Sequence, residues 1–304
     1  MNPRILITGT TGYVGGTVIG ALLEKHPEYQ VVSLVRTDEQ ASIIKSGFPS
    51  VETVIGGLNI SSVFEAEASN VNVVLNLASA DHITGAVSLM KGVGQGSNKN
   101  AVVVHVFGTV ILTEMSDGPG NSASKLYNDM IPADVKEILS FDMSHIHRDV
   151  ENAFVDAAAK YNVKTAILSP LVIHGIGRSL VKTRSIHIDN LTTTIMVLVE
   201  EALKGPQSQA QCKDVSIAIA KTRHAKGLLK SEQVDKLTVE EATRIHPWAP
   251  ILWDGNSRGA GERLKELGWR SDGKTIFDSI PEMIDAEVGK HGQSQKLTFA
   301  GRLN

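Results

Sequence analysis

The sequence predicts an α/β fold, a doubly wound parallel sheet followed by a small, trimmed and mainly helical C-terminal cap. Short apolar runs rich in β-branched residues alternate with stretches of helical periodicity over residues 3–168, which is the pattern of consecutive βα units. The run over residues 71–78 is almost continuously apolar, as is typical of a parallel strand covered on both faces. A glycine-rich turn at residues 9–15 joins the first strand to the first helix.

The predicted elements follow one another with short connections. Right-handed crossovers place the carboxyl ends of all the strands at one edge of the sheet, where ligands of such folds bind. Strands are expected at residues 3–8, 29–36, 51–55, 71–78, 100–107 and 163–168, and helices after residue 15, from residue 61, over 81–93 and over 147–161.

Three glycines with the spacing G-x-x-G-x-x-G stand between the first strand and the first helix. This context is that of a dinucleotide-binding fingerprint, because glycines allow a tight turn and a close approach of the backbone to a pyrophosphate. The N-terminus of the helix then offers free N–H groups to the phosphates. A glycine-rich turn without a ligand is the alternative. The contacts expected from this turn are Gly9, Thr11, Gly12, Tyr13, Val14 and Gly15.

Arg36 ends the second strand at the place where the ribose of a dinucleotide is bound. An acidic residue there selects NAD, whereas a guanidinium suits the 2′-phosphate of NADP. We therefore expect NADP, and the nearby Asp38 keeps NAD open as the alternative. Other residues expected at the same edge are Leu58, Ala78, Ser79 and Thr109.

Residues 113–146 interrupt the alternation of strands and helices. Residues 118–122 read as a loop, and the stretch that holds Lys125 and Tyr127 shows no clean period. A long irregular stretch at the ligand edge of a compact domain is often functional, and a surface loop is the alternative.

The chain divides into a dinucleotide-binding domain over residues 1–176, a helical substrate cap over 177–291 that is interleaved with it, and a tail over 292–304. The tail is expected to be poorly anchored. Cap helices are expected at residues 190–203, 212–229, 239–246, 258–267 and 276–290.

The composition is that of an ordinary globular protein, with 42% hydrophobic and 21% charged residues. A net charge of −3 gives no electrostatic reason to expect nucleic acid or an anionic membrane as a partner. The single cysteine, Cys212, excludes an internal disulfide. The chain runs from Met1 straight into a strand and holds no apolar run of spanning length, so we expect no signal peptide, no membrane segment and a cytoplasmic location. We identify no metal site.

Several motifs together resemble the extended short-chain dehydrogenases/reductases, the relatives of NAD(P)-dependent epimerases and dehydratases. The match runs nearly from end to end and is closest to divergent, fungal-type members. The resemblance implies a Rossmann-like fold, and it implies that Pro170 and Ile173 pack on the nicotinamide. The matching stretches are Thr8–Gly15 (the TGxxGxxG motif), Asn72–Ser79, Ser169–Gly175, Ile186–Leu191 and Asn256–Trp269, which ends in L-G-W.

The catalytic residues of that family are not all present. The resemblance implies a Y-x-x-x-K pair at the start of the helix after the fifth strand, with a Ser or Thr at the end of that strand. Here His147 stands in the place of the Tyr and Glu151 in that of the Lys, while Thr109 matches the Ser/Thr position. A histidine transfers protons near neutral pH, so His147 is a candidate acid/base, with a polar helix start as the alternative. Lys125 and Tyr127 are the other candidates, if their loop folds back onto the site.

The cap is shorter than the resemblance implies. Residues 183–186 lead directly into His187, where the family has a longer substrate-binding segment, and residues 205–214 lack the strand expected there. A reshaped, open pocket suits a compact hydrophobic molecule better than a nucleotide sugar, and it equally suits a protein that has lost catalysis.

Three functions remain open from the sequence. The first is an NADP-dependent oxidoreductase or epimerase-like enzyme that acts on a small carbonyl or hydroxyl compound, in secondary metabolism. The second is a non-redox isomerase, dehydratase or cyclase in which the cofactor is structural. The third is a catalytically silent dinucleotide sensor, as the NmrA-like proteins are. The expected partner is a small-molecule substrate, and a homodimer is left open.

Overall fold

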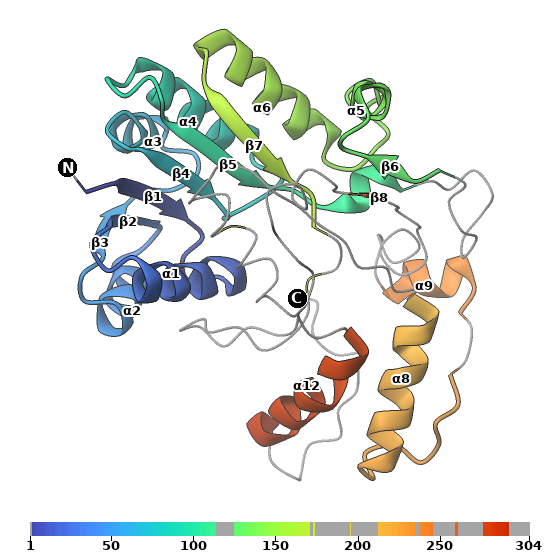
Figure 1. Ribbon diagram of the computed structural model, residues 1–304. Coiled ribbons are helices and arrows are strands. Elements are labelled where there is room, and N and C mark those ends of the chain that lie inside the picture. The colour runs from blue at the N-terminus through green and yellow to red at the C-terminus, as the bar shows by residue number, and fades with distance from the viewer. Residues whose placement is uncertain are drawn as a thin grey trace.

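The computed structural model describes residues 2–113, 125–170, 173, 195, 212–234, 237–245, 259–260 and 276–291. Its centre is a parallel sheet of six strands in the order β3-β2-β1-β4-β5-β7 (Figure 1), which confirms the predicted α/β, Rossmann-like fold. The strand order reverses between β1 and β4, the switch point at which such sheets bind ligands. The strands are β1 (Arg4–Thr8), β2 (Gln30–Val35), β3 (Glu52–Ile55), β4 (Val73–Asn76), β5 (Val102–Val106) and β7 (Lys164–Leu168).

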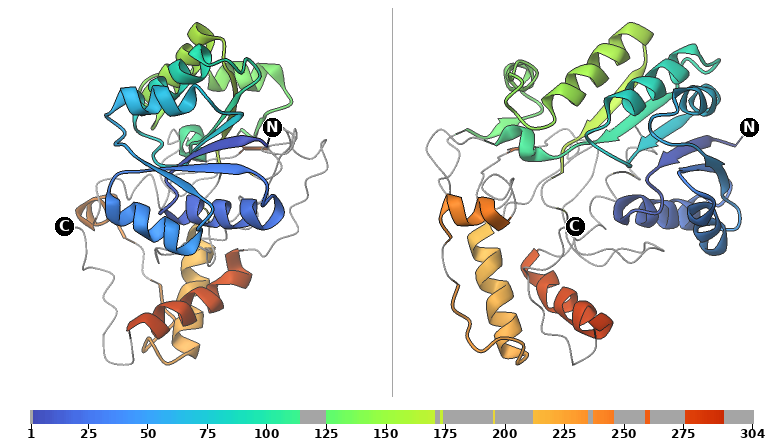
Figure 2. Two further views of the ribbon diagram at one scale, coloured as in Figure 1. Left: turned by 90° about the vertical axis from the view of Figure 1, so that its left-hand side faces the viewer. Right: turned by 180° about the vertical axis from the view of Figure 1, so that it is seen from behind.

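Helices cover both faces of the sheet (Figure 2). One face carries α1 (Tyr13–Lys25) and α2 (Asp38–Gly47), and the other carries α3 (Ser61–Ala68), α4 (Ile83–Gln95) and α6 (Arg148–Tyr161).

The side chains of β1 show why both faces are apolar. Ile5 and Ile7 pack in the cluster that contains Ile19 of α1, whereas Leu6 packs with Phe64 of α3 and with α4 and α6 on the opposite face. All of these side chains are fully buried. Neighbouring residues of a strand point to opposite faces, so a strand covered on both sides carries apolar side chains on both.

The region expected to be irregular contains short elements that no helical or strand period reveals. Within its described part, β6 is Tyr127–Asn128 and α5 is Pro132–Ile138. Proline at the first helical position and Asp134 in the first turn start α5, which at seven residues is too short to display an amphipathic repeat. β6 pairs in parallel with β8 (Gly259–Ala260), so the helix expected over 258–267 is wrong at these two residues.

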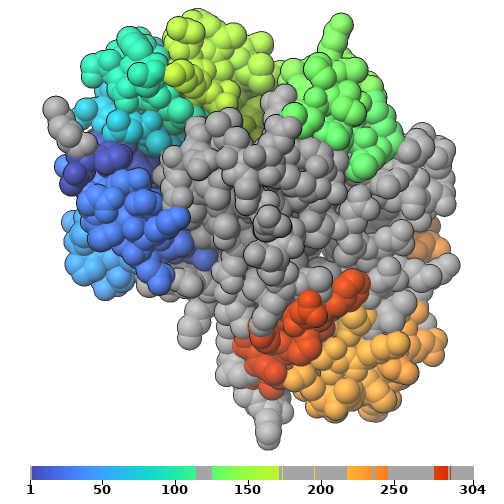
Figure 3. Space-filling view, viewed as in Figure 1, coloured from blue at the N-terminus to red at the C-terminus, as the bar shows by residue number. Residues whose placement is uncertain are grey.

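The C-terminal helices that the structure describes are α8 (Cys212–Ala225), α9 (Val239–Ile245) and α12 (Ile276–His291). α12 packs against α8, as Figures 1 and 3 show. Lys226, just after α8, binds Asp285 of α12 at 2.5 Å between Nζ and Oδ1. Ile195 lies fully buried in the cluster that covers the α1 face of the sheet.

Several expectations fall outside the described residues: the rest of the 190–203 helix, the 183–191 and 205–211 stretches of the trimmed cap, and the tail. Among the residues that are described, no helix is both long and apolar enough to cross a membrane.

Candidate active site

The glycine turn at the carboxyl end of β1 is built so tightly that two of its residues must be glycine. Gly9 has a φ of +76°, and a Cβ there would lie 2.6 Å from the carbonyl oxygen of Leu77. A Cβ on Gly15 would lie 2.2 Å from the carbonyl oxygen of Gly9. Both distances are far below van der Waals contact, so a side chain at either position would force the turn open.

Helix α1 begins directly after this turn, with Tyr13 as its first residue. Gly12 is the N-cap, donates its N–H to the Gly9 carbonyl (2.9 Å) and carries no side chain to cap the helix. The first helical hydrogen bond is Gly16 N–H to Gly12 O (2.9 Å), so the amides of Tyr13, Val14 and Gly15 precede the helical ladder. Such a helix start is an anion site, and its pairing with the close-packed glycines fits a dinucleotide pyrophosphate. The neighbouring Thr11 lies in the same turn.

A buried polar network supports the turn from beneath, and the sequence reasoning missed it. Thr8 Oγ1 donates to Asn76 Oδ1 (2.8 Å) and accepts from the amides of Leu77 (3.1 Å) and Ala78 (3.3 Å). The side-chain amide of Asn76 bonds His105 Nδ1 at 2.9 Å. The signal available in the sequence is that Asn76 and His105 are polar residues inside otherwise apolar strands. The network ties the loop after β4 to the end of β1.

His105 is fully buried and electrostatically unusual. Its ring stacks on Phe154 (4.8 Å between centroids) and meets Phe107 edge to face (4.1 Å). Burial lowers the pKa of His105 to about 4, and the nearby charge of His147 acts in the same direction. The imidazole is therefore neutral at physiological pH.

The remaining residues expected to bind the cofactor lie at the carboxyl edge. Arg36 follows β2 with an exposed side chain, and its amide donates to Gln40 Oε1 (2.9 Å), which holds the strand end against α2. Leu58 packs onto the apolar cluster beside α3 and α4. Ala78 touches the glycine turn, since its Cα would be 2.8 Å from a Cβ on Gly9. Ser79 Oγ accepts the amide of Asp81 (3.1 Å) and so shapes the loop before α4.

Thr109 and Pro170 meet where β5 and β7 end. The Thr109 amide donates to the Pro170 carbonyl (3.1 Å), and Thr109 Oγ1 lies 3.4 Å from the same oxygen. Ile173 is partly buried against the cluster on the α1 face of the sheet. The structure thus brings Thr109 and Pro170 together at the carboxyl ends of β5 and β7.

His147 stands immediately before α6, so the helix begins at Arg148, one residue later than expected. Its backbone is left-handed, with a φ of 67°, an unusual conformation for a residue other than glycine. The ring is 18% exposed, and its Nδ1 hydrogen-bonds the carboxylate of Asp81 in the loop between β4 and α4.

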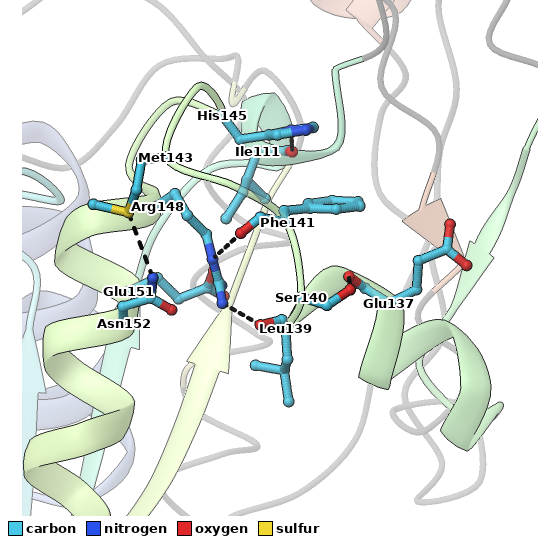
Figure 4. Close-up of polar contacts among 10 residues, drawn as sticks. All are labelled: Ile111, Glu137, Leu139, Ser140, Phe141, Met143, His145, Arg148, Glu151 and Asn152. Carbon is cyan, nitrogen blue, oxygen red and sulfur yellow. Dashed lines mark hydrogen bonds and ion pairs between the residues drawn. The ribbon is translucent and has the colours of Figure 1, made fainter.

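Glu151 does not occupy a cofactor-facing position of the kind that the family's Lys takes; it is paired inside the protein (Figure 4). Its Oε2 lies 2.5 Å from Nη1 of Arg148, and the two side chains are only 7% and 4% exposed. The same guanidinium donates to the carbonyls of Phe141 (3.1 Å) and Leu139. Burial raises the pKa of Glu151, and the contact with Arg148 opposes that rise.

These contacts fasten the chain between α5 and α6. His145 adds to them, because its Nδ1 bonds the Ile111 carbonyl (2.8 Å) and its ring stacks on Phe141 (Figure 4). The backbone that carries His147 is therefore anchored on both sides.

Lys125 and Tyr127, the other predicted catalytic residues, contact the carboxylates of α5. Lys125 Nζ lies 2.5 Å from Glu137 and 3.2 Å from Asp134. The hydroxyl of Tyr127 donates to Glu137 Oε1 (3.0 Å), and its ring is 5% exposed and packs edge to face with Phe141. The hydrogen bond to Glu137 raises the pKa of Lys125. Both groups have partners that account for their positions in the fold.

A cavity of about 140 Å³ lies at the opposite edge of the sheet, where β5 and β7 begin. Its lining includes Asn98, Lys99, Tyr161 and Val163, none of which belongs to the carboxyl edge. We assign the site to the carboxyl edge, because the glycine turn, Thr109 and His147 all lie there.

Comparison with known proteins agrees with this fold. No family model matches the chain. A curated relative, the oxidase ucsJ of Acremonium sp., is 25% identical over 350 residues, covering 97% of this chain and all of the relative.

Among solved structures, vestitone reductase from alfalfa is 16% identical with a TM-score of 0.59, covering 95% of this chain and 99% of that one. WbmH from Bordetella bronchiseptica, solved with NAD⁺, is 10% identical with a TM-score of 0.64, covering 96% and 100%. Gre2 from Candida albicans, solved with NADPH, is 16% identical with a TM-score of 0.52, covering 95% and 100%. The chain thus shares the fold of these solved structures, which include a reductase and two complexes with NAD⁺ or NADPH.

Proposed function

We propose that this chain is an NADP(H)-dependent oxidoreductase or epimerase-like enzyme that acts on a small, hydrophobic carbonyl or hydroxyl compound. The observation that carries the proposal is the turn at residues 9–15, where Gly9 and Gly15 exclude any side chain beside the N-terminus of α1, whose N-cap Gly12 has no capping side chain. That arrangement supports a dinucleotide site at the edge where Thr109 and His147 also lie. The oxidase and reductase relatives support the same class of chemistry.

NADP is favoured over NAD by Arg36. The guanidinium is exposed at the end of β2, where the 2′-phosphate of the adenosine ribose would be bound. Relatives of this fold include a structure with NADPH and one with NAD⁺, so the choice rests on this residue. When bound, the dinucleotide would supply hydride transfer.

The residues of this chain would bind the substrate oxygen and move its proton. Thr109 stands where β5 ends and would hydrogen-bond that oxygen through its hydroxyl. His147 has Nδ1 engaged by Asp81, which leaves Nε2 as the ring atom able to exchange a proton with the substrate. This role differs from a Tyr–Lys pair, because Glu151 is held by Arg148 and supplies no cation.

Two measurements test the proposal. Calorimetric titration of the protein with NADPH and NADH should show binding of both, with NADPH the tighter. Incubation with NADPH and a panel of small carbonyl compounds should then consume cofactor, as followed by absorbance at the nicotinamide band. Absence of dinucleotide binding by the folded protein would overturn the proposal.

A non-redox isomerase, dehydratase or cyclase is the second candidate, and the observation that favours it is the replacement of the Tyr and Lys by His147 and a buried Glu151. In that case the dinucleotide binds but is not consumed, and substrate is converted with no change in nicotinamide absorbance. Binding without any conversion would instead indicate a silent sensor.

A further inference from the structure

We propose that Asp81 is a positioning residue that fixes the tautomer of His147, so that neutral His147 presents an unprotonated Nε2 to the substrate. The inference deepens the proposed function and rests on it for its catalytic meaning. The Asp81 carboxylate contacts His147 Nδ1 across 66 residues of sequence, from the loop after β4 to the start of α6. A carboxylate only accepts, so Nδ1 must carry the hydrogen of this bond.

The loop that presents Asp81 is held on both sides of that residue. The amide of Asp81 donates to Ser79 Oγ at 3.1 Å. The next residue, His82, caps α4 by accepting the amide of Gly85 at its Nδ1 (3.0 Å), and its Nε2 bonds Asn59 Oδ1 (2.9 Å). Although the Asp81 side chain is 67% exposed, the loop around it is therefore held by one hydrogen bond of its own amide and two of the neighbouring His82 side chain.

The backbone of His147 is held as well, and in a costly conformation. A residue with a Cβ is less stable in the left-handed region than in the right-handed helical one. The carbonyl of His147 accepts the Glu151 amide (3.0 Å), and the Arg148 amide donates to His145 O (3.2 Å). Left-handed residues of this kind persist where the surroundings determine them, and they are often found at functional sites. Here the result is an imidazole that meets the loop after β4.

Asp81 and His105 are both titratable groups near the His147 ring. His105, whose charge would interact with that of His147, is kept neutral by burial and adds no positive charge at physiological pH. Asp81 is the group that contacts the ring directly and stabilises the imidazolium formed when Nε2 takes up a proton. Holding Nδ1 in place also fixes the direction of Nε2.

The test reads the tautomer directly. The holoprotein labelled with ¹⁵N-histidine is observed by long-range ¹H–¹⁵N correlation at a pH where His147 is neutral, and the His147 signals are identified by their loss in His147→Gln. In the wild type we expect Nδ1 protonated and Nε2 unprotonated. In Asp81→Asn the amide can donate to Nδ1, and the proton should move to Nε2. Asp149→Asn is the matched control, because it removes an exposed carboxylate from the first turn of the same helix.

The expected kinetic consequence is a fall in kcat of roughly a hundredfold or more in Asp81→Asn, with the affinity for NADPH unchanged within a few-fold. Asp149→Asn should change neither the tautomer nor kcat. A wild-type His147 with Nε2 protonated, or a tautomer unmoved by Asp81→Asn, would overturn the positioning role. Because the tautomer is read without turnover, a protein that converts no carbonyl would contradict the proposed function and still leave this result decisive for Asp81.

Discussion

Arg148 and Glu151 form a buried ion pair in the first turn of α6, at the very position where a cofactor-facing lysine would be expected from the family resemblance. The guanidinium of Arg148 also donates to the carbonyls of Leu139 and Phe141 and so joins α6 to the segment after α5. A residue that looks like a lost catalytic group is thus a structural one, and this has consequences for any attempt to restore a Tyr–Lys enzyme.

The first prediction concerns this pair. Glu151→Lys, alone or with His147→Tyr, should prevent folding, because two buried cations would face each other without a counterion. Glu151→Gln should lower the free energy of unfolding by about 3–5 kcal/mol, since it leaves Arg148 buried without its charge partner. Urea denaturation followed by circular dichroism measures both. The control is Asp156→Asn, an exposed carboxylate on the same helix that should change stability by less than about 0.5 kcal/mol.

The second prediction concerns the glycine turn. Gly12→Asp should abolish NADPH binding in a folded protein, because a side chain and a negative charge would enter the approach to the helix N-terminus. Gly20→Ala is the control on the same helix: a Cβ there would lie 3.7 Å from the ring of Phe48, an ordinary contact. It should bind NADPH normally. Wild-type affinity of Gly12→Asp by calorimetry would rule out the turn as the cofactor site.

Cofactor choice provides the third prediction. Arg36→Ala should weaken NADPH binding by about 1–3 kcal/mol and NADH binding much less, because only NADPH carries the 2′-phosphate that the guanidinium would contact. Lys45→Ala, which removes an exposed cation from the last turn of α2, should affect the two cofactors equally. If Arg36→Ala weakens both cofactors to the same degree, Arg36 does not read the 2′-phosphate.

The fourth prediction concerns His147 itself. His147→Phe should lower kcat by about a hundredfold or more while leaving NADPH affinity within a few-fold, since the ring transfers a proton but does not hold the dinucleotide. Lys125→Met should do less damage to kcat, because Lys125 is paired with Asp134 and Glu137. Steady-state kinetics on both variants shows whether His147 or Lys125 contributes more to kcat. A larger loss in Lys125→Met would move the proton-transfer role to the loop of Lys125 and Tyr127.

The last prediction concerns pH and stability. The pKa of His105 is lowered to about 4 in the folded protein, against about 6.5 for an unfolded histidine, so between these values the unfolded chain binds the extra proton. The contribution of His105 to stability should therefore be complete above pH 6.5 and should fall by roughly 3 kcal/mol as the pH drops towards 4. Urea unfolding at pH 7.5, 6 and 5 should show a smaller loss in His105→Gln than in the wild type. If the wild type and His105→Gln lose the same unfolding free energy as the pH falls, the pH dependence does not come from His105.

Local patterns along the chain determined most of the fold. Apolar runs such as residues 71–78 predicted the parallel strands, because a strand buried on both faces cannot carry polar residues without partners. Gly9 and Gly15 marked the turn, since no other residue fits so close to neighbouring backbone. The position of Arg36 followed from counting along one βα unit.

Only the tertiary structure decided which side chains meet. Asp81 and His147 are 66 residues apart and come together because β4 and β5 are neighbours in the sheet and α6 packs beside α4. Thr8, Asn76 and His105 likewise lie on three different strands. Glu151 aligns with a catalytic position in the sequence, yet in the structure it forms an ion pair with Arg148. Burying either charge alone would cost more free energy than burying the two as a pair. Periodicity reports the faces of single elements, whereas these contacts depend on how the sheet orders its strands and how the helices pack on it.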